Sequence, residues 1–160
     1  MSEKAQNKQG KGGTQDVPAL FAVFNEIGII AQLSSALLNR RLPDGLHTSH
    51  FGILSHLSKR DFDETPVMLA DAFQVTKGTM THSLAVLEKR GLIDIRPNPK
   101  DGRSKIVKIT QAGRDLVVAG RAALAPTIAA LAQLTDTKRY EALLPDLIQL
   151  REILDDNRDI

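Results

Sequence analysis

Basic and hydroxyl side chains are concentrated between Thr76 and Lys108. This segment holds eight lysine or arginine residues and three acidic residues, a net charge of +5, whereas the whole chain carries +2 at pH 7. The rest of the chain is therefore slightly acidic, at −3. A basic segment on a near-neutral body is the charge distribution expected of a surface that binds a polyanion.

A helix is predicted at the start of this basic segment. Thr76 can cap it, because a threonine hydroxyl accepts a hydrogen bond from a free backbone amide of the first turn. Met80, Leu84 and Leu87 recur at helical spacing and form its apolar face. Gly91 supplies the left-handed residue that ends the helix.

A basic hairpin is predicted after this helix. Residues 92–96 and 105–109 alternate apolar and polar side chains, as short strands do. The prolines and the glycine of residues 97–102 exclude a helix or a strand ladder there, so we expect a protruding loop. A helix followed by such a hairpin is typical of a winged helix-turn-helix. The helix would enter the major groove of DNA and the loop an adjacent minor groove.

The polar residues of the helix lie off its apolar stripe and should face outward. Thr79 and Thr81 would contact base edges or phosphate and Lys77 a phosphate, although a solvated helix face is the alternative. On the wing, Arg103 is predicted to enter a narrow minor groove. Asp101 could instead pair with Arg103 or another basic side chain and orient the wing. The predicted DNA-binding residues are Thr76, Lys77, Gly78, Thr79, Thr81, His82, Lys100, Asp101, Arg103, Ser104 and Lys105.

The rest of the chain is predicted to be mostly helical and to support the basic segment, residues 76–108. Helical stripes are expected from Asp16 to Arg40, from Thr48, from Pro66 and from Thr110 to Leu134. A last helix should run from Thr135 or Asp136 to Leu154. Pro126 should bend the long helix or mark a break in it, and Pro145 should kink the last one. The predicted regions are a disordered tail (1–15), an N-terminal dimerisation helix (16–45), a winged helix-turn-helix lobe (46–110) and C-terminal dimerisation helices (111–160).

Composition excludes several classes of function. The chain has no cysteine, so disulfides, thiolate metal sites and cysteine redox sensing are ruled out. It has no phosphate-binding glycine loop, no nucleophile beside a base and no recognisable pair of acids, so neither an enzyme nor a cofactor is expected. No apolar run approaches the ~20 residues of a membrane span, and the N-terminus lacks a signal-peptide core. We therefore expect a cytoplasmic protein with no membrane partner.

Four stretches of the chain resemble the MarR family of bacterial transcriptional regulators. They are LHTSHFGILSHL (46–57), MLADAFQVTKGTMTHSLAVLEKRGLI (68–93), RPNPKDGRSKIVKIT (96–110) and the following QAGRDL. The most specific part is the D-x-R-S wing followed by Ile-Thr-x-x-Gly. The resemblance covers residues 20–155 in layout. It implies a mainly α-helical fold with a small antiparallel β-wing, and a homodimer whose base is formed by the terminal helices.

Two positions depart from the family's usual pattern. His82 stands where arginine is frequent, and Gly78 where serine is frequent. Operator contacts at these positions therefore cannot be carried over, and the target sequence stays open.

His47 and His50 lie three residues apart near a helix start. A zinc site is the alternative reading, but zinc needs three or four converging ligands and no carboxylate cluster accompanies the pair. We expect no metal site. By resemblance, an effector pocket would lie near the first and second helices, with His47 and His50 as weak candidates. Small aromatic or phenolic anions are common effectors in the family.

The apolar stripes of residues 20–38 and 140–154 need a surface to bury against, because residues 46–110 already hold their own core. A second subunit would supply it through a two-fold interface. Two such lobes predict a pseudo-palindromic operator with half-sites about one helical turn, ~34 Å, apart. The sequence thus predicts a homodimeric regulator that binds specific double-stranded DNA, typically a repressor released by a small molecule. The alternative is a winged-helix protein-interaction module, which would not need the basic segment.

Overall fold

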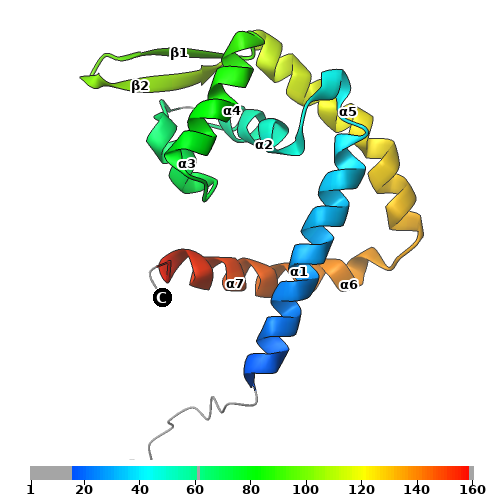
Figure 1. The fold of residues 1–160 in the computed structure, drawn as a ribbon. Helices are drawn as coiled ribbons and strands as arrows, with labels where there is room; N and C mark the ends of the chain where they lie inside the picture. The colour runs from blue at the N-terminus through cyan, green and yellow to red at the C-terminus, as the bar shows by residue number, and fades with distance from the viewer. Residues whose placement is uncertain (1–15, 61, 159–160) are drawn as a thin grey trace, which may run out of the picture. The chain divides into compact units, whose positions relative to one another are not determined.

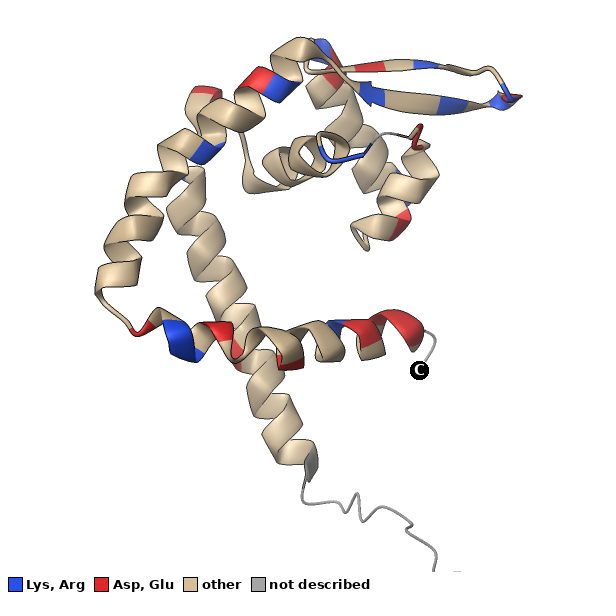
Figure 2. Cartoon of the chain, turned by 180° about the vertical axis from the view of Figure 1, so that it is seen from behind, with Lys and Arg blue, Asp and Glu red and all other residues tan. Residues whose placement is uncertain are grey.

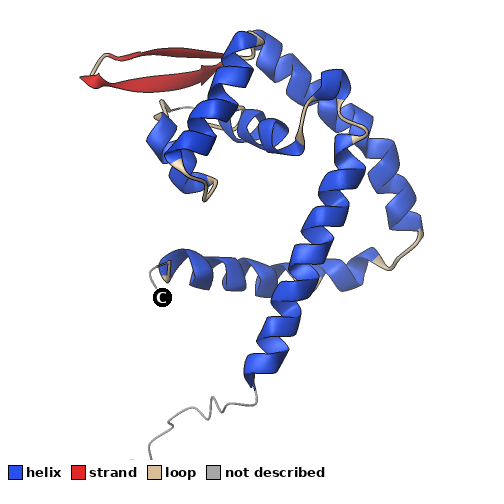
Figure 3. Cartoon of the chain, viewed as in Figure 1, coloured by secondary structure: helices blue, strands red, loops and turns tan. Residues whose placement is uncertain are grey.

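The computed structural model describes residues 16–60 and 62–158. The chain divides between Arg40 and Arg41 into two compact units. The first contains the helix α1 (Asp16–Asn39) (Figure 1). The second contains, in order, η1 (Pro43–Gly45), α2 (Thr48–Leu57), α3 (Pro66–Ala72), α4 (Lys77–Lys89), β1 (Ile93–Asn98), β2 (Asp101–Ile109), α5 (Gln111–Gln133), α6 (Thr137–Glu141) and α7 (Leu144–Asp156) (Figure 3). The predicted tail, residues 1–15, lies outside the described residues.

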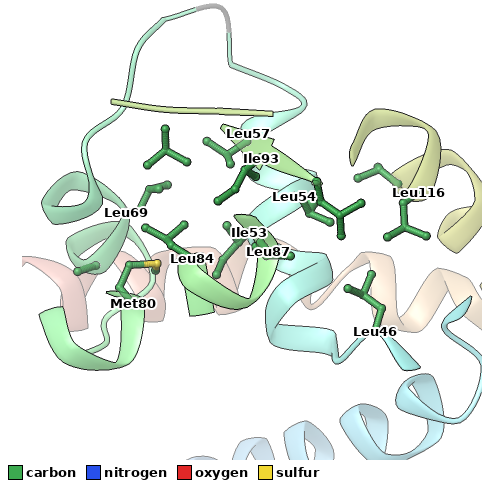
Figure 4. Packing of buried hydrophobic residues seen from close by; sticks show 14 of the residues in the cluster. Leu46, Ile53, Leu54, Leu57, Leu69, Met80, Leu84, Leu87, Ile93 and Leu116 are labelled. Carbon is green, nitrogen blue, oxygen red and sulfur yellow. The ribbon is translucent and has the colours of Figure 1, made fainter. Parts of the chain in front are cut away.

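The fold is mainly helical with one two-stranded antiparallel sheet, as the sequence predicts. The core of the second unit lies between α2, α3, α4 and the base of the sheet (Figure 4). Leu54, Leu69, Leu84, Leu87 and Ile93 are at most 1% exposed. The expected apolar stripe of α4 is therefore its buried face, and the polar residues between its members face solvent.

Threonine caps fix where three of the helices begin. The hydroxyl oxygens of Thr65, Thr76 and Thr110 each accept a hydrogen bond from the backbone amide three residues on, at 3.1–3.2 Å. Each bond satisfies one of the amides that a first helical turn leaves free. At the other end of α4, Gly91 has a φ of 69°, the left-handed conformation predicted for it.

The wing is longer than the sequence suggests. Residues 97–102 were expected to form an unpaired loop, but Pro97 pairs with Lys105 and Asn98 with Asp101. The ladder is irregular between Pro97 and Asn98. A two-stranded sheet has two edge strands, so a proline is tolerated where its missing amide would face outward. The turn is thereby confined to Pro99 and Lys100.

The proline predictions for the C-terminal helices are only partly right. Pro126 lies inside α5, which continues unbroken from Gln111 to Gln133. The single helix expected after Asp136 is instead two helices, α6 and α7. Pro145 lies in the first turn of α7 rather than at an internal kink. There its missing amide costs no hydrogen bond, so proline favours a helix start.

Two glycines let α5 approach the rest of the unit closely. A Cβ on Gly113 would lie 2.2 Å from the carbonyl oxygen of Leu92, and one on Gly120 would lie 2.5 Å from the ring of Phe51. Both distances are far inside van der Waals contact. The start of α5 is therefore packed against the base of the wing and against α2.

The helix α1 is apolar along its length. Between Asp16 and Asn39 it carries one charged residue after its first position, Glu26, and it is almost entirely tan in Figure 2. Residues Val17–Asn39 and Gln111–Gln133 are long and apolar enough to cross a membrane by length and composition alone. The expectation that no segment reaches this length considered uninterrupted apolar runs. Both helices contain polar and charged residues, such as Glu26 and Arg121, but their mean hydropathy stays high. Core helices of soluble proteins pass the same test, so the result is weak evidence for a membrane.

Candidate nucleic-acid interface

The first turn of α4 uses two of its hydroxyl groups internally. The Oγ1 atoms of Thr76 and Thr79 lie 2.9 Å apart, and Thr76 Oγ1 also accepts a hydrogen bond from the backbone amide of Thr79. Both residues are exposed, as are Lys77, Gly78 and His82. The exposed face of α4 therefore carries a lysine and several polar groups in a helix start that is already stabilised by its own cap.

Thr81 is oriented by a hydrogen bond within the helix. Its hydroxyl donates to the carbonyl oxygen of Lys77 at 2.8 Å. The lone pairs of the oxygen and the methyl group remain available on the exposed surface. Thr81 can therefore accept a hydrogen bond or contact a thymine methyl group, but its proton is in use.

Gly78 is not required by the fold of α4. A Cβ at this position would meet one atom within 4 Å, the hydroxyl oxygen of Thr76 at 3.8 Å. The backbone conformation is helical, so neither φ nor internal packing selects glycine. A glycine on an exposed helix face lets another backbone or a phosphate approach closely.

The tip of the wing is held by its own polar side chains. Asn98 Oδ1 accepts the amide of Lys100 at 2.9 Å, and Asn98 Nδ2 donates to Ser104 Oγ at 2.9 Å. Asp101 Oδ1 accepts the amide of Arg103 at 3.0 Å, and the Ser104 hydroxyl donates to the carbonyl of Asp101 at 3.1 Å. Asp101 thus holds the backbone of Arg103, not its guanidinium as the sequence had left possible.

The basic segment contains paired and unpaired cations. Arg96 pairs with Asp94 at 2.7 Å and Lys108 with Asp63 at 2.8 Å, and both pairs are exposed. Among the residues that the structure describes, no carboxylate pairs with the wing-tip cations. These are Lys100, Arg103 and Lys105. Figure 2 shows positive charge along β2 and at the tip of the wing. Among the described residues, the tip therefore offers cations that are not held in ion pairs with a carboxylate.

Asn98 is a site residue that the sequence reasoning missed. It was read as part of a loop, yet it organises the turn that presents Lys100 and Arg103. The signal was present, because asparagine and aspartate on either side of Pro99-Lys100 are residues that bond to the backbone two positions on.

His47 and His50 do not form a pocket with each other. Nδ1 of His47 lies 3.5 Å from the amide of Ser49 as the N-cap of α2. The rings of His47 and His50 lie edge to face, 6.4 Å apart. Burial, and then the neighbouring His47, Arg90 and His82, lower the pKa of His50 from its ordinary value. These surroundings favour the neutral imidazole, which is a poor partner for an anion.

Two surface cavities lie elsewhere in the second unit. One, of about 230 Å³, is lined by the end of α2, the following loop, β2 and the start of α5, and the other, of about 390 Å³, by α2 and Arg60. Neither is lined by His47 or His50. Across residues 16–60 and 62–158, no three histidine or acidic side chains gather as metal ligands would. The effector site predicted at the two histidines stays a prediction.

Comparison with known proteins places this geometry in a family. Residues 44–104, which include α2, α3, α4 and most of the wing, match the model of the MarR family. An uncharacterised HTH-type transcriptional regulator of Mycobacterium leprae is 41% identical over 59 residues, which are 37% of this chain and 41% of that protein. The match thus spans about two fifths of the length of this curated relative.

The structural similarity extends over nearly the whole chain. The transcriptional regulator BldR from Sulfolobus solfataricus is 26% identical, with a TM-score of 0.76 over 87% of this chain and 99% of that one. The chain is thus similar to the winged helix-turn-helix regulators of the MarR family, most specifically over residues 44–104. A mutant of MarR from E. coli, solved with operator DNA, is 22% identical with a TM-score of 0.72 over 87% of this chain and 99% of its own, and shares the fold.

The match to the MarR family confirms part of what the sequence predicts. The matched proteins are winged helix-turn-helix transcription regulators and not enzymes, and the shared fold includes the N- and C-terminal helices. The match does not test the boundaries predicted for the tail, lobe and dimerisation regions. The same holds for the individual DNA-binding residues, which stay predictions.

Proposed function

We propose that this MarR-family protein is a homodimeric transcriptional regulator that binds a specific, pseudo-palindromic double-stranded DNA operator in the cytoplasm. The observation that supports the proposal is that the chain has two exposed surfaces suited to DNA. One is the polar first turn of α4, which Thr76 caps, and the other is the set of wing-tip cations that form no ion pair. A helix of this kind fits the major groove, and arginine at a narrow wing fits the minor groove.

The proposed contacts divide by their chemistry. Thr79, Thr81 and His82 would meet base edges or phosphates from α4, and the cap of Thr76 and the bare backbone of Gly78 would allow close approach. Lys77, Lys100, Arg103 and Lys105 would neutralise phosphates or enter the minor groove. Asp101 and Ser104 would act by holding the wing turn, since their polar groups are used there.

A homodimer is supported by the apolar residues left exposed on the terminal helices. On α1, Phe21 is 75% exposed and Leu33 67%; on α7, Leu144 is 53% exposed and Leu154 52%. A helix that is apolar around its circumference is stable in water only when another surface covers it. A second copy of the chain covers it in the proposed assembly.

The proposal is tested by selecting duplexes from a random pool with the unaltered protein and titrating a selected duplex at several salt concentrations. We expect a specific complex of one dimer with one duplex and a steep fall of affinity with salt. Lys77→Ala should weaken all duplexes alike and flatten the salt dependence by about one unit of slope. Failure to enrich any sequence, with weak binding that salt does not affect, would support the protein-interaction module instead.

Repression and release by a small molecule are the finer part of the proposal. They are supported by the family resemblance alone. A selected operator placed before a reporter gene tests repression, and expression should rise when the protein is removed. Aromatic carboxylates and phenols, added to the complex with the selected duplex, test release.

A further inference from the structure

Glu64 is a buried acid at the base of the wing. It lies between α2 and α3, is 4% exposed, and is the one charged side chain in the described core. Its carbonyl oxygen accepts the amide of Val107 at 2.8 Å, which adds an isolated bridge beside β2. Because Val107 also pairs with Ile95 of β1, the backbone of Glu64 extends the sheet at its base.

The side chain of Glu64 ties this base to two helices. Its Oε1 lies 2.9 Å from Nε2 of His56 on α2, where the imidazole donates to the carboxylate. The His56 ring in turn lies edge-on against Phe73 at the end of α3, with 5.4 Å between ring centroids. Glu64 therefore joins the wing by its backbone and α2 by its carboxylate, and it reaches α3 only through the ring of His56.

This pair is an inefficient way to stabilise a core. Among the described residues, Oε2 of Glu64 is buried with no hydrogen-bond partner. A buried carboxylate with one hydrogen bond is costly, and well-packed apolar side chains at such sites are often as stable or more stable. Its directional hydrogen bond is what an apolar side chain could not reproduce.

We propose that Glu64, acting through His56, is a positioning residue that fixes the wing relative to α2, so that the wing tip and α4 engage one DNA duplex together. The part that concerns DNA rests on the function proposed above. An apolar residue at position 64 would fill the same space but leave the wing free to tilt about its base.

Two substitutions separate positioning from stability. Glu64→Leu removes the hydrogen bond and fills the space, whereas Glu64→Gln keeps an acceptor for the imidazole. With Glu64→Leu we expect an unchanged or higher melting temperature, at least about tenfold faster amide hydrogen exchange in β1 and β2 but not in α4, and about tenfold weaker binding of a selected duplex. Glu64→Gln should restore exchange and affinity to near those of the unaltered protein.

A double-mutant cycle identifies the wing as the part that is displaced. In a background with Arg103→Ala, Glu64→Leu should weaken binding by much less than tenfold, because the wing contact is already lost. Asp63→Asn is the matched control. Asp63 is the neighbour of Glu64 in the sequence, and the substitution breaks its exposed ion pair with Lys108. It should change neither amide hydrogen exchange in the wing nor affinity for the selected duplex. If Glu64→Leu does not fold, the double variant His56→Leu with Glu64→Leu replaces the whole pair by apolar side chains.

The outcomes are distinct. Unchanged exchange or unchanged affinity in a folded Glu64→Leu protein overturns the proposal. So does a lower melting temperature with faster exchange throughout the lobe, which is the mark of a merely structural pair. If the unaltered protein selects no duplex, the proposed function fails, and exchange confined to the wing still decides whether Glu64 positions it.

Discussion

The lobe formed by α2, α3, α4 and the wing differs from α1 and α7 in what its apolar residues touch. Leu54, Leu69 and Leu87 of the lobe are fully buried, whereas Phe21 of α1 is 75% exposed and Leu154 of α7 52%. Both regions show leucine-rich stripes at helical spacing. Such a stripe predicts which face of a helix needs cover, and only packing decides whether the same chain supplies that cover.

The largest effect is expected from deleting residues 137–160, which removes α6 and α7. If a second subunit covers these helices, the deletion exposes the interface, and the chain should become insoluble or unfold. Size-exclusion chromatography and circular dichroism test this, with removal of residues 1–15 as the control that should change neither. A well-folded monomer that keeps its affinity for a selected duplex would contradict the contrast between lobe and terminal helices.

Two single substitutions, one in the lobe and one on α1, test whether the two regions are covered in different ways. Leu87→Ala should lower the free energy of unfolding by about 2–5 kcal/mol at every protein concentration, because it leaves a cavity in a closed core. Phe21→Ala should instead raise the dissociation constant of the dimer and steepen the concentration dependence of the melting temperature. Thermal unfolding over a range of concentrations distinguishes them. Equal behaviour of the two variants would mean that α1 is part of the same closed core.

Arg103→Ala tests whether an exposed residue of the lobe contributes to DNA binding rather than to the stability of the fold. The guanidinium has no ion pair among the described residues, so the melting temperature should hardly change. Binding of a selected duplex should weaken by at least about tenfold, ~1.4 kcal/mol, and more where the flanks are rich in A·T pairs. Arg121→Ala on α5 removes the same charge outside the basic segment and should bind normally. An unchanged dissociation constant for Arg103→Ala would show that the wing does not touch DNA.

Thr81 provides the smallest and most specific test. Thr81→Ala should cost about 1 kcal/mol in specific binding. Because the Thr81 proton is donated to the carbonyl oxygen of Lys77, DNA could use only the oxygen lone pairs and the methyl group of this side chain. Thr81→Val keeps that methyl group and replaces the hydroxyl by a second one, so it removes the acceptor. Retained affinity in Thr81→Val would assign a methyl contact, and equal losses would assign an accepted hydrogen bond. Titration of a selected duplex decides between them, and no loss in either variant means that this face of α4 is not the recognition surface.

The sequence alone was sufficient for most of the lobe and for its class of function. Helix caps, apolar spacing and helix-ending glycines act within a few residues. The roles of Thr76 and Gly91 and the apolar stripe of α4 could therefore be predicted directly from the sequence. The excess of positive charge from Thr76 to Lys108 likewise needs no fold to be counted. Local chemistry therefore predicted the helix, the wing and a polyanion as the partner.

Tertiary structure decided what depends on residues distant in sequence. The wing ladder continues through Pro97 because its strand, β1, is an edge strand, and Pro145 begins a helix rather than bending one. His56 and Glu64 each look like ordinary surface residues in the sequence, yet they meet 2.9 Å apart beneath the wing. Whether a charged side chain is buried, and which partner satisfies it, follows from how helices and strands pack, and no local pattern contains that information.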